Sequence, residues 1–182
     1  LSIADMLVSP FRGQEAEVLV GMFDGQSLTG GGSKIAKYLH ENFRMTFEEE
    51  IKKLSPTDSG PTDALRRTFL SLNKDMAAAA SRSIDVREQR MNSIHRGSTV
   101  AQVLNQDDIN SGGVATILYL NNSDLFVANV GDAQALLIQV NAQWKWLTRK
   151  HDPANEPRER ERIREAGGYV SRQGKLNDVL EV

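Results

Sequence analysis

The sequence predicts an α+β fold in a single domain. Two long segments with helical periodicity lie together in the first half of the chain, and segments with strand periodicity lie together after residue 112. Helices and strands grouped in this way, without strict alternation, are typical of α+β proteins rather than of parallel α/β sheets. The chain of 182 residues is close to the usual size of one domain.

The first third of the chain predicts two strands and one helix. Residues 1–9 alternate weakly between apolar and polar side chains and predict a short strand, and residues 18–23, VLVGMF, predict a buried strand. From Lys34 to Leu54, apolar residues recur every four positions, which predicts an amphipathic helix. Glycines at 30–32 precede this helix, and Ser33 is its candidate N-cap.

The middle of the chain predicts a second helix and a β-meander. The helix is predicted to begin near Thr62 and to continue through MAAAASRSIDVREQR, whereas residues 92–110 carry no clear pattern. Beyond Gly113, the segments VATILYL, DLFVANV and AQALLIQV show the period of strands and predict a three-stranded meander.

The C-terminal part predicts short strands around one charged helix. WKWLT predicts a strand on which Trp144 and Trp146 share a face, and we expect that face to be buried in the core or in an interface. PRERERIREAG predicts a helix with Pro157 in its first turn, a stop at Gly167 and solvated i,i+4 ion pairs. YVS and KLNDVLEV predict further pieces of strand.

Composition excludes several classes of function. Lys and Arg total 22 against 24 Asp and Glu, so no basic surface predicts a nucleic-acid partner. The absence of cysteine excludes disulfides, thiolate metal sites and Cys nucleophiles, and it fits a cytoplasmic location. No apolar run approaches the roughly 18 residues of a membrane span. Because the chain begins on Leu1 rather than Met, we expect a domain excised from a larger multidomain polypeptide.

Two acids stand at the ends of predicted strands. Asp24 follows the strand VGMF and precedes Gly25, and Asp132 follows the strand LFVANV and Gly131. Glycine at these positions lets the backbone approach a ligand closely, and carboxylate oxygens suit hard cations such as Mg²⁺ or Mn²⁺. The alternative is that both acids are turn residues that accept backbone hydrogen bonds.

Three blocks of sequence resemble the metal-dependent Ser/Thr protein phosphatases of the 2C type. GMFDGQS is similar to the family's strand-end D-G-H-G-G, and SGGVATILYLNNSDLFVANVGDAQALLI resembles its S-G-S-T-A meander followed by V-G-D-S-R-A. The segment from LTRKHDP to LEV resembles the family's L-T-x-D-H-x-P, E-x-x-R-I-x-x-A-G-G and N-G-R-V-x-G-x-L-A-V series. The blocks keep the family's order and cover most of the chain outside residues 55–110.

The resemblance implies a β-sandwich flanked by helices in α-β-β-α layers. It also implies a two-metal site at one edge, where a metal-bridging hydroxide attacks a phosphoserine or phosphothreonine. Asp24 matches the bridging aspartate, Gly25 the glycine whose carbonyl reaches metal, and Asp5 the Asp of the family's E-D pair. Asp132 matches the V-G-D motif and is implied to be structural. The other positions implied to be structural are Gly131, Ser111, Gly112, His151, Gly167 and Gly168.

Several departures from the family's pattern weaken the implied metal site. Gln26 replaces a histidine that the family uses near the leaving-group oxygen, and an amide cannot donate a proton with a useful pKa. Ala4 replaces the acid partner of Asp5, and Gln134 replaces the Arg of G-D-S-R. Near the family's acid before S-G-S-T, the acids of this chain, Asp107 and Asp108, are displaced by a residue or two.

The C-terminal part of the family pattern also lies outside this chain. The sequence ends at LEV, before the family's S-R-x-x-G-D and D-N segments, which carry two of the usual metal aspartates. Two divalent cations repel strongly and need several carboxylates to neutralise them. We therefore expect one weak Mg²⁺ or Mn²⁺ site at Asp24, Gly25 and Asp5, or none, and little phosphatase turnover.

A narrower resemblance joins this chain to the type-2C-like domain of fungal adenylate cyclases. It rests on LSIADML with FRG, on Gln26 in place of the histidine that follows FDG in the phosphatases, and on RKHDPANEPRERERIREAGGYVSRQGKLNDVLEV. The resemblance implies a parent protein that makes cAMP from ATP, responds to Ras GTPases and associates with a cyclase-associated protein. It also implies a cytoplasmic protein held peripherally at the membrane through Ras, with its cyclase domain outside this chain.

We therefore expect a regulatory or scaffolding pseudophosphatase module. Its expected partners are other domains of the same polypeptide, with Ras and the cyclase-associated protein, and residues 55–110 are expected to form a homo-oligomeric or interdomain contact. One alternative is an active Mg²⁺- or Mn²⁺-dependent Ser/Thr phosphatase, with the missing carboxylates supplied by polypeptide beyond Val182. A third hypothesis is a stand-alone binding protein unrelated to cyclases.

Overall fold

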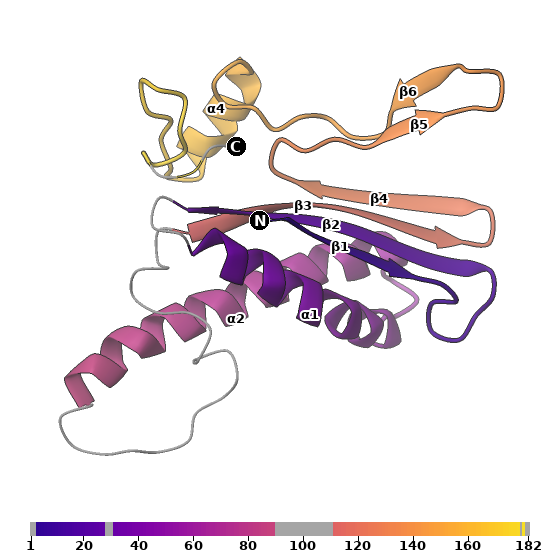
Figure 1. Cartoon of the computed structure of the whole chain (residues 1–182), viewed down its shortest axis with the longest axis horizontal. Coiled ribbons are helices and arrows are strands. Elements are labelled where there is room, and N and C mark those ends of the chain that lie inside the picture. The colour runs from indigo at the N-terminus through magenta and orange to yellow at the C-terminus, as the bar shows by residue number, and fades with distance from the viewer. Residues whose placement is uncertain (1–2, 28–30, 90–110, 179, 181–182) are drawn as a thin grey trace.

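The protein forms one four-stranded sheet with two long helices against one face. The structure is a computed structural model that describes residues 3–27, 31–89, 111–178 and 180, with side chains described outside 80–89. Figure 1 shows α1 and α2 on one side of the sheet, with β5, β6 and α4 on the other. The elements are β1 (Ile3–Val8), β2 (Glu17–Ser27), α1 (Gly32–Lys52), α2 (Pro61–Gln89), β3 (Ser111–Asn121), β4 (Asp124–Val130), β5 (Leu136–Ile138), β6 (Trp144–Trp146) and α4 (Pro157–Glu165).

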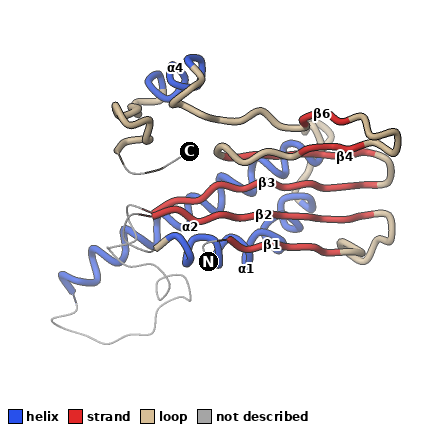
Figure 2. The backbone as a smooth tube through the Cα atoms, turned by 45° about the horizontal axis from the view of Figure 1, so that its top comes forward, coloured by secondary structure: helices blue, strands red, loops and turns tan. Residues whose placement is uncertain are grey.

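The sheet is antiparallel throughout and has the order β1-β2-β3-β4, as Figure 2 shows. The predicted strands of the N-terminal third and the β3–β4 hairpin are confirmed. The predicted position of Asp24 at a strand end is wrong, because β2 continues through Asp24 and Gly25 to Ser27, paired with β3. The predicted third strand of the meander is wrong, because β5 pairs with β6 in a separate two-stranded sheet. Gly131 takes a φ of 90° directly after β4, and Ala135 hydrogen-bonds with Leu147 and Thr148, so the chain leaves the sheet there.

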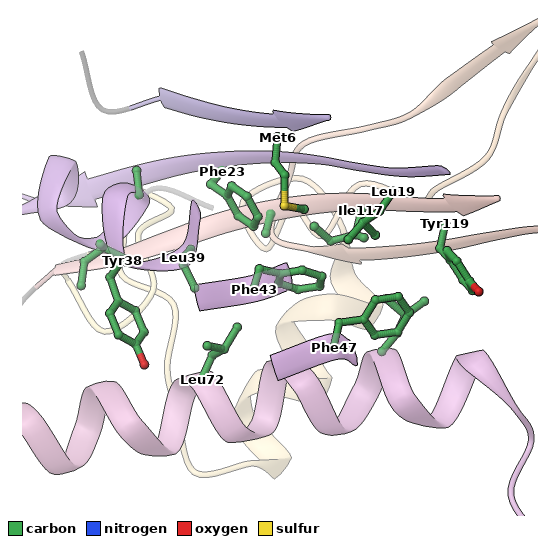
Figure 3. Close-up of a cluster of buried hydrophobic side chains, with 14 of the residues drawn as sticks. Met6, Leu19, Phe23, Tyr38, Leu39, Phe43, Phe47, Leu72, Ile117 and Tyr119 are labelled. Atoms are coloured by element: carbon green, nitrogen blue, oxygen red, sulfur yellow. The ribbon is translucent and has the colours of Figure 1, made fainter. Parts of the chain in front are cut away.

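The helix layer rests on aromatic packing. The four-residue period predicted for α1 is confirmed, since Ile35, Leu39, Phe43 and Phe47 are all buried. Figure 3 shows Phe43 and Phe47 between α2 and the sheet, with ring centroids 5.7 Å from Phe23 and 5.2 Å from Tyr119, respectively. Ser33 is not the N-cap, because the helix begins at Gly32 after Gly31 and no side chain caps it.

The connection between β1 and β2 is closed by a partly buried ion pair. Arg12 donates from Nε and Nη2 to the two carboxylate oxygens of Glu17, at 2.9 and 2.6 Å, and Glu17 is only 5% exposed. The same guanidinium lies 3.4 Å from the hydroxyl of Tyr119 on β3. This cluster therefore joins the first turn of the chain to the centre of the sheet.

The face of the sheet turned away from α1 and α2 is also apolar. Side chains at alternate positions of β1, β2 and β4 are exposed there, among them Leu7, Met22 and Leu125. Apolar residues on both faces of a sheet are typical of a strand layer inside a sandwich. This composition fits the predicted sandwich, and β5 and β6 lie on this side of the sheet (Figure 1).

The C-terminal part confirms the charged helix and corrects two details. Pro157 opens α4, and Gly167, with a φ of 84°, follows its end. The ion pairs Arg162–Glu159 and Arg164–Glu161 have i,i+3 rather than i,i+4 spacing. The last predicted strands form only isolated bridges at residues 170, 176 and 180.

The prediction that Trp144 and Trp146 are buried in the core is wrong, because both side chains are more than half exposed on β6. Among the helices in the described residues, none combines the length and the hydropathy needed to cross a membrane.

Candidate metal centre

The register of β1 and β2 places the two candidate metal ligands on one face of the sheet. Asp24 lies opposite Ile3, and Asp5 lies opposite Met22, so the two acids are diagonal neighbours. Opposed residues and residues two apart share a face, here the face turned away from α1 and α2. Diagonal side chains lie roughly 7–8 Å apart, a spacing at which two carboxylates can reach one cation between them.

Ala4, which stands where the family's E-D pair has its glutamate, does not point to the face that carries Asp5. Ala4 lies opposite Phe23 and packs against the helix-covered core. Its side chain therefore points away from Asp5, as alternation along a strand requires. The described residues contribute two carboxylates here, Asp5 exposed and Asp24 half-buried.

The carbonyl of Gly25 is held against the first turn of α1. A Cβ on Gly32 would come within 2.4 Å of the Gly25 carbonyl oxygen, and a Cβ on Gly25 within 1.7 Å of the Gly32 carbonyl oxygen. The two glycines thus let β2 and α1 make backbone contact. This contact places Gly32 against the carbonyl that the resemblance assigns to metal.

Gln26 lies beside Asp24 with a buried polar atom. Its Oε1 has no hydrogen-bond partner among the residues that the structure describes. In the register of the sheet it lies opposite Gly112, where an added Cβ would lie 2.8 Å from Cδ1 of Leu180. The next pair, Ser27 and Ser111, joins its hydroxyls at 2.8 Å. This end of the sheet therefore carries amides and hydroxyls where catalysis needs a titratable group.

These donors do not fit a two-metal centre. Among the described residues, no group of three or more His, Cys, Asp or Glu side chains is arranged to hold a metal ion. Two dications carry four positive charges, and Asp5 and Asp24 would neutralise two of them. Asp107 and Asp108 lie outside the described residues. The pair fits one Mg²⁺ or Mn²⁺ at most, with water or carbonyl oxygens completing its shell.

Asp132 belongs to a different cluster, beyond the end of β4. Lys150 lies between two carboxylates, 3.6 Å from Asp132 and 3.3 Å from Asp152, and these contacts raise the pKa of Lys150. Asp152 accepts hydrogen bonds from the backbone and side chain of Asn155, which lower its pKa. Asp132 thus ties the turn after β4 to the loop before α4.

The motif residues His151, Gly167 and Gly168 lie near the two ends of α4. The N–H of His151 donates to the carbonyl of Gly131, and its Nδ1 lies 3.4 Å from Glu159 on α4. The guanidinium of Arg162 is the main cause of the lowered pKa of Glu159. At the other end of α4, Gly167 and Gly168 donate to the carbonyls of the helix's last turn. These contacts hold α4 against the end of the sheet.

Two features of the site were missed by the sequence patterns. The sequence places the glycines at 30–32 before the helix without showing their role, whereas the structure shows that Gly32 permits close packing on Gly25. Lys150, between Asp132 and Asp152, was not singled out either. The sequence from Asp24 to Gly32 gives no signal for such a contact. A lysine two residues before Asp152 does indicate an ion pair.

Comparisons with known proteins agree with this arrangement. A family model described as "Protein phosphatase 2C" matches residues 4–182. An adenylate cyclase of Podospora anserina is 56% identical over all of this chain, and one of Neurospora crassa is 50% identical. The chain spans only 8% of the length of each of these cyclases. A probable protein phosphatase 2C of Paramecium tetraurelia is 27% identical over 90% of the chain, which spans 47% of that protein.

Solved structures show the same fold. A sex-determining protein of C. elegans superimposes on 99% of the chain with a TM-score of 0.63 and 21% identity, and the chain spans 42% of it. A phosphatase of Toxoplasma gondii superimposes on 100% of the chain with a TM-score of 0.56 and 16% identity, and the chain spans 58% of it.

Proposed function

The chain belongs to the protein phosphatase 2C family, and we propose that it is a pseudophosphatase module with a regulatory or scaffolding role inside a fungal adenylate cyclase. Matches at 56% and 50% identity over the whole chain support the cyclase as its context. The chain's share of those relatives, 8%, supports a module that acts through neighbouring domains of the same polypeptide.

The composition of the candidate metal centre is the observation that carries the proposal. Asp24 and Asp5 are the two carboxylates that the described residues bring to this face, and Ala4 points into the core. Gln26 stands where the family places a histidine, so the site lacks a proton donor for the leaving group. An enzyme of this kind depends on two metals to generate and aim a hydroxide, so loss of ligands removes most of the rate.

The parent protein supplies the activity in this proposal. A cyclase domain elsewhere in the polypeptide makes cAMP from ATP, and this module positions that domain relative to its regulators. The proposed regulators are a Ras GTPase and a cyclase-associated protein, in the cytoplasm and peripherally at the membrane. A homo-oligomeric or interdomain contact through residues 55–110 is part of the same proposal; unchanged cyclase assembly after this segment is trimmed would contradict it.

An active phosphatase is the second candidate. It is favoured by the retention of Asp24 and Asp5 on one face, where further carboxylates from outside residues 1–182 would complete a two-metal centre. The share of the Paramecium phosphatase that this chain spans, 47%, leaves room for such residues.

A phosphatase assay separates the two candidates. The 182-residue chain and the full-length polypeptide that contains it are incubated with Mn²⁺ or Mg²⁺ and an aryl phosphate or a phosphoserine peptide. The proposal predicts no hydrolysis above that of Asp24→Asn in either protein. Metal-dependent hydrolysis that Asp24→Asn abolishes would overturn it.

A further inference from the structure

The loop that joins α1 to α2 presents a serine to solvent. The loop runs from residue 53 to residue 60, and Ser55, Pro56 and Thr57 are exposed in it. The hydroxyl of Ser55 lies 2.9 Å from the hydroxyl of Thr57 and 2.9 Å from Oδ2 of Asp58. A kinase needs its acceptor hydroxyl on an accessible, non-helical segment, and surface loops supply such segments. Ser55 therefore meets the steric requirement for a phosphate acceptor.

The sequence around Ser55 indicates the class of kinase. Ser55 is followed by Pro56, and a proline has no backbone N–H. A kinase that takes the proline ring in an apolar pocket selects such a site, and a kinase that must accept that N–H rejects it. The chain has one other Ser-Pro sequence, at Ser9. The basic residue nearest to Ser9 in the sequence is Arg12, which is paired with Glu17, so Arg12 offers little to a phosphate on Ser9.

Arg67 on α2 offers a receptor for a phosphate on Ser55. Its Nη2 lies 3.1 Å from Oδ1 of Asp58, and its Nε lies 3.6 Å from Oε2 of Glu50. Both nitrogens are buried, and neither makes a hydrogen bond with the residues that the structure describes. A guanidinium is satisfied best by two parallel hydrogen bonds to one oxyanion. Asp58 and Glu50 therefore hold Arg67 by charge and leave its donors for a better acceptor.

We propose that Ser55 is phosphorylated by a proline-directed Ser/Thr kinase, and that its phosphate replaces Asp58 as the partner of Arg67. In the reaction, Oγ of Ser55 bonds to the γ-phosphorus of ATP, the bond from that phosphorus to ADP breaks, and the hydroxyl proton passes to the kinase. The carboxylate of Asp58 spans the gap between acceptor and guanidinium, with one oxygen toward each. A phosphate on Ser55 occupies the same gap.

Charge drives this exchange of partners. The backbone N–H of Ser55, the guanidinium of Arg67 and the hydroxyl of Ser55 together lower the pKa of Asp58 to about 2. Phosphorylation removes the hydroxyl donor and places a charge of about −1.5 to −2 beside the carboxylate. The two anions repel, whereas the phosphate offers the guanidinium three acceptor oxygens. The carboxylate of Asp58 is therefore the group that leaves.

The site is separate from the candidate metal centre. The 21 residues of α1 put roughly 30 Å between its first turn, which contacts Gly25, and its last turn, which precedes Ser55. The inference therefore goes beyond the pseudophosphatase proposal and does not depend on it.

Kinase labelling followed by mass-spectrometric mapping tests the site. The 182-residue chain and the full-length polypeptide that contains it are incubated with a mitogen-activated protein kinase, Mg²⁺ and ATP. The proposal predicts stoichiometric phosphate on Ser55 in both proteins and loss of that phosphate in Ser55→Ala. Asp24→Asn is labelled in parallel. Phosphate that stays on Ser55 only in this variant would refute the pseudophosphatase and support the site.

Thermal melts test the exchange of partners. Asp58→Asn should lower the melting temperature of the unphosphorylated chain, because it weakens the contact with Arg67. In the phosphorylated chain the same substitution should cause less than half of that shift, since Asp58 no longer holds Arg67. Asp63→Asn is the matched control, because Asp63 accepts a hydrogen bond from the backbone N–H of Ser59 in the same loop, at 2.7 Å. Its shift should be equal in the two forms.

Three results would overturn the proposal. Absence of phosphate from Ser55, with or without label on Ser9, excludes the site. Phosphate on Ser55 in the 182-residue chain alone shows that the full-length polypeptide covers this loop. Equal shifts for Asp58→Asn with and without phosphate mean that Arg67 keeps its carboxylate partner.

Discussion

Replacement of Gly131 by alanine should destabilise the fold for two reasons, the left-handed backbone conformation and a steric clash with Val114. Gly131 has a φ of 90°, and a Cβ on it would lie 2.1 Å from Cγ1 of Val114, which is buried on the central strand β3. Alanine in a left-handed conformation costs about 1–2 kcal/mol, and overpacking adds about 1–3 kcal/mol. The expected loss in free energy of unfolding is therefore about 2–5 kcal/mol.

Gly60→Ala is the matched control for the cost of placing alanine in a left-handed backbone conformation. Gly60 has a φ of 65° and no atom within 4 Å of an added Cβ, so its replacement should cost only the conformational part. Urea denaturation followed by far-UV circular dichroism gives both values. If the Gly131→Ala and Gly60→Ala variants lose the same stability within about 0.5 kcal/mol, the packing argument is refuted.

A second substitution keeps this prediction testable if Gly131→Ala folds poorly. Val114→Ala removes the methyl group that the new Cβ meets. It should therefore cost less in the Gly131→Ala background than in the wild-type chain, and a double-mutant cycle measures the difference. Additive losses would show that Val114 is not the obstacle.

Three more substitutions test the account. Gly25→Ala places a Cβ 1.7 Å from a carbonyl oxygen of α1, so it should prevent close packing of β2 and lose more stability than Gly131→Ala in the same urea assay. Arg12→Ala leaves buried Glu17 unpaired and should cost about 2–3 kcal/mol, part of which the additional change Glu17→Gln should recover. Hydrogen bonds, first from the backbone N–H of Ser55, lower the pKa of Asp58 from 3.8 to about 2. The contribution of Asp58 to stability is thus present above pH 4 and lost as pH falls toward 2. In thermal melts, Asp58→Asn should therefore reduce the difference in melting temperature between pH 6 and pH 2.5.

Local periodicity predicted most of the α+β architecture. The positions Ile35, Leu39, Phe43 and Phe47 fix one face of α1 regardless of what covers it, and they are buried as predicted. β5 shows where this reasoning fails. Its residues alternate like those of β3 and β4, but the left-handed turn at Gly131 directs the chain to pair with β6, and periodicity carries no pairing information.

The candidate site was predictable by residue type but not by geometry. Asp24 and Gly25 stand at a strand end in the sequence, and Asp5 enters only through the family resemblance. Their placement on one face depends on the register of β1 against β2, which pairs Asp24 with Ile3. The contact of Gly25 with Gly32 depends on how α1 docks on β2, a long-range feature that neither segment encodes alone.

The number of metal ions at Asp24 and Asp5 tests the pseudophosphatase proposal most directly. Mn²⁺ is titrated into the full-length polypeptide that contains this chain, and into its Asp24→Asn variant, with electron paramagnetic resonance and calorimetry as readouts. The account predicts at most one weakly bound Mn²⁺ that depends on Asp24, with no spin coupling between ions. Two tightly bound, spin-coupled Mn²⁺ ions that are lost together in the variant would contradict it.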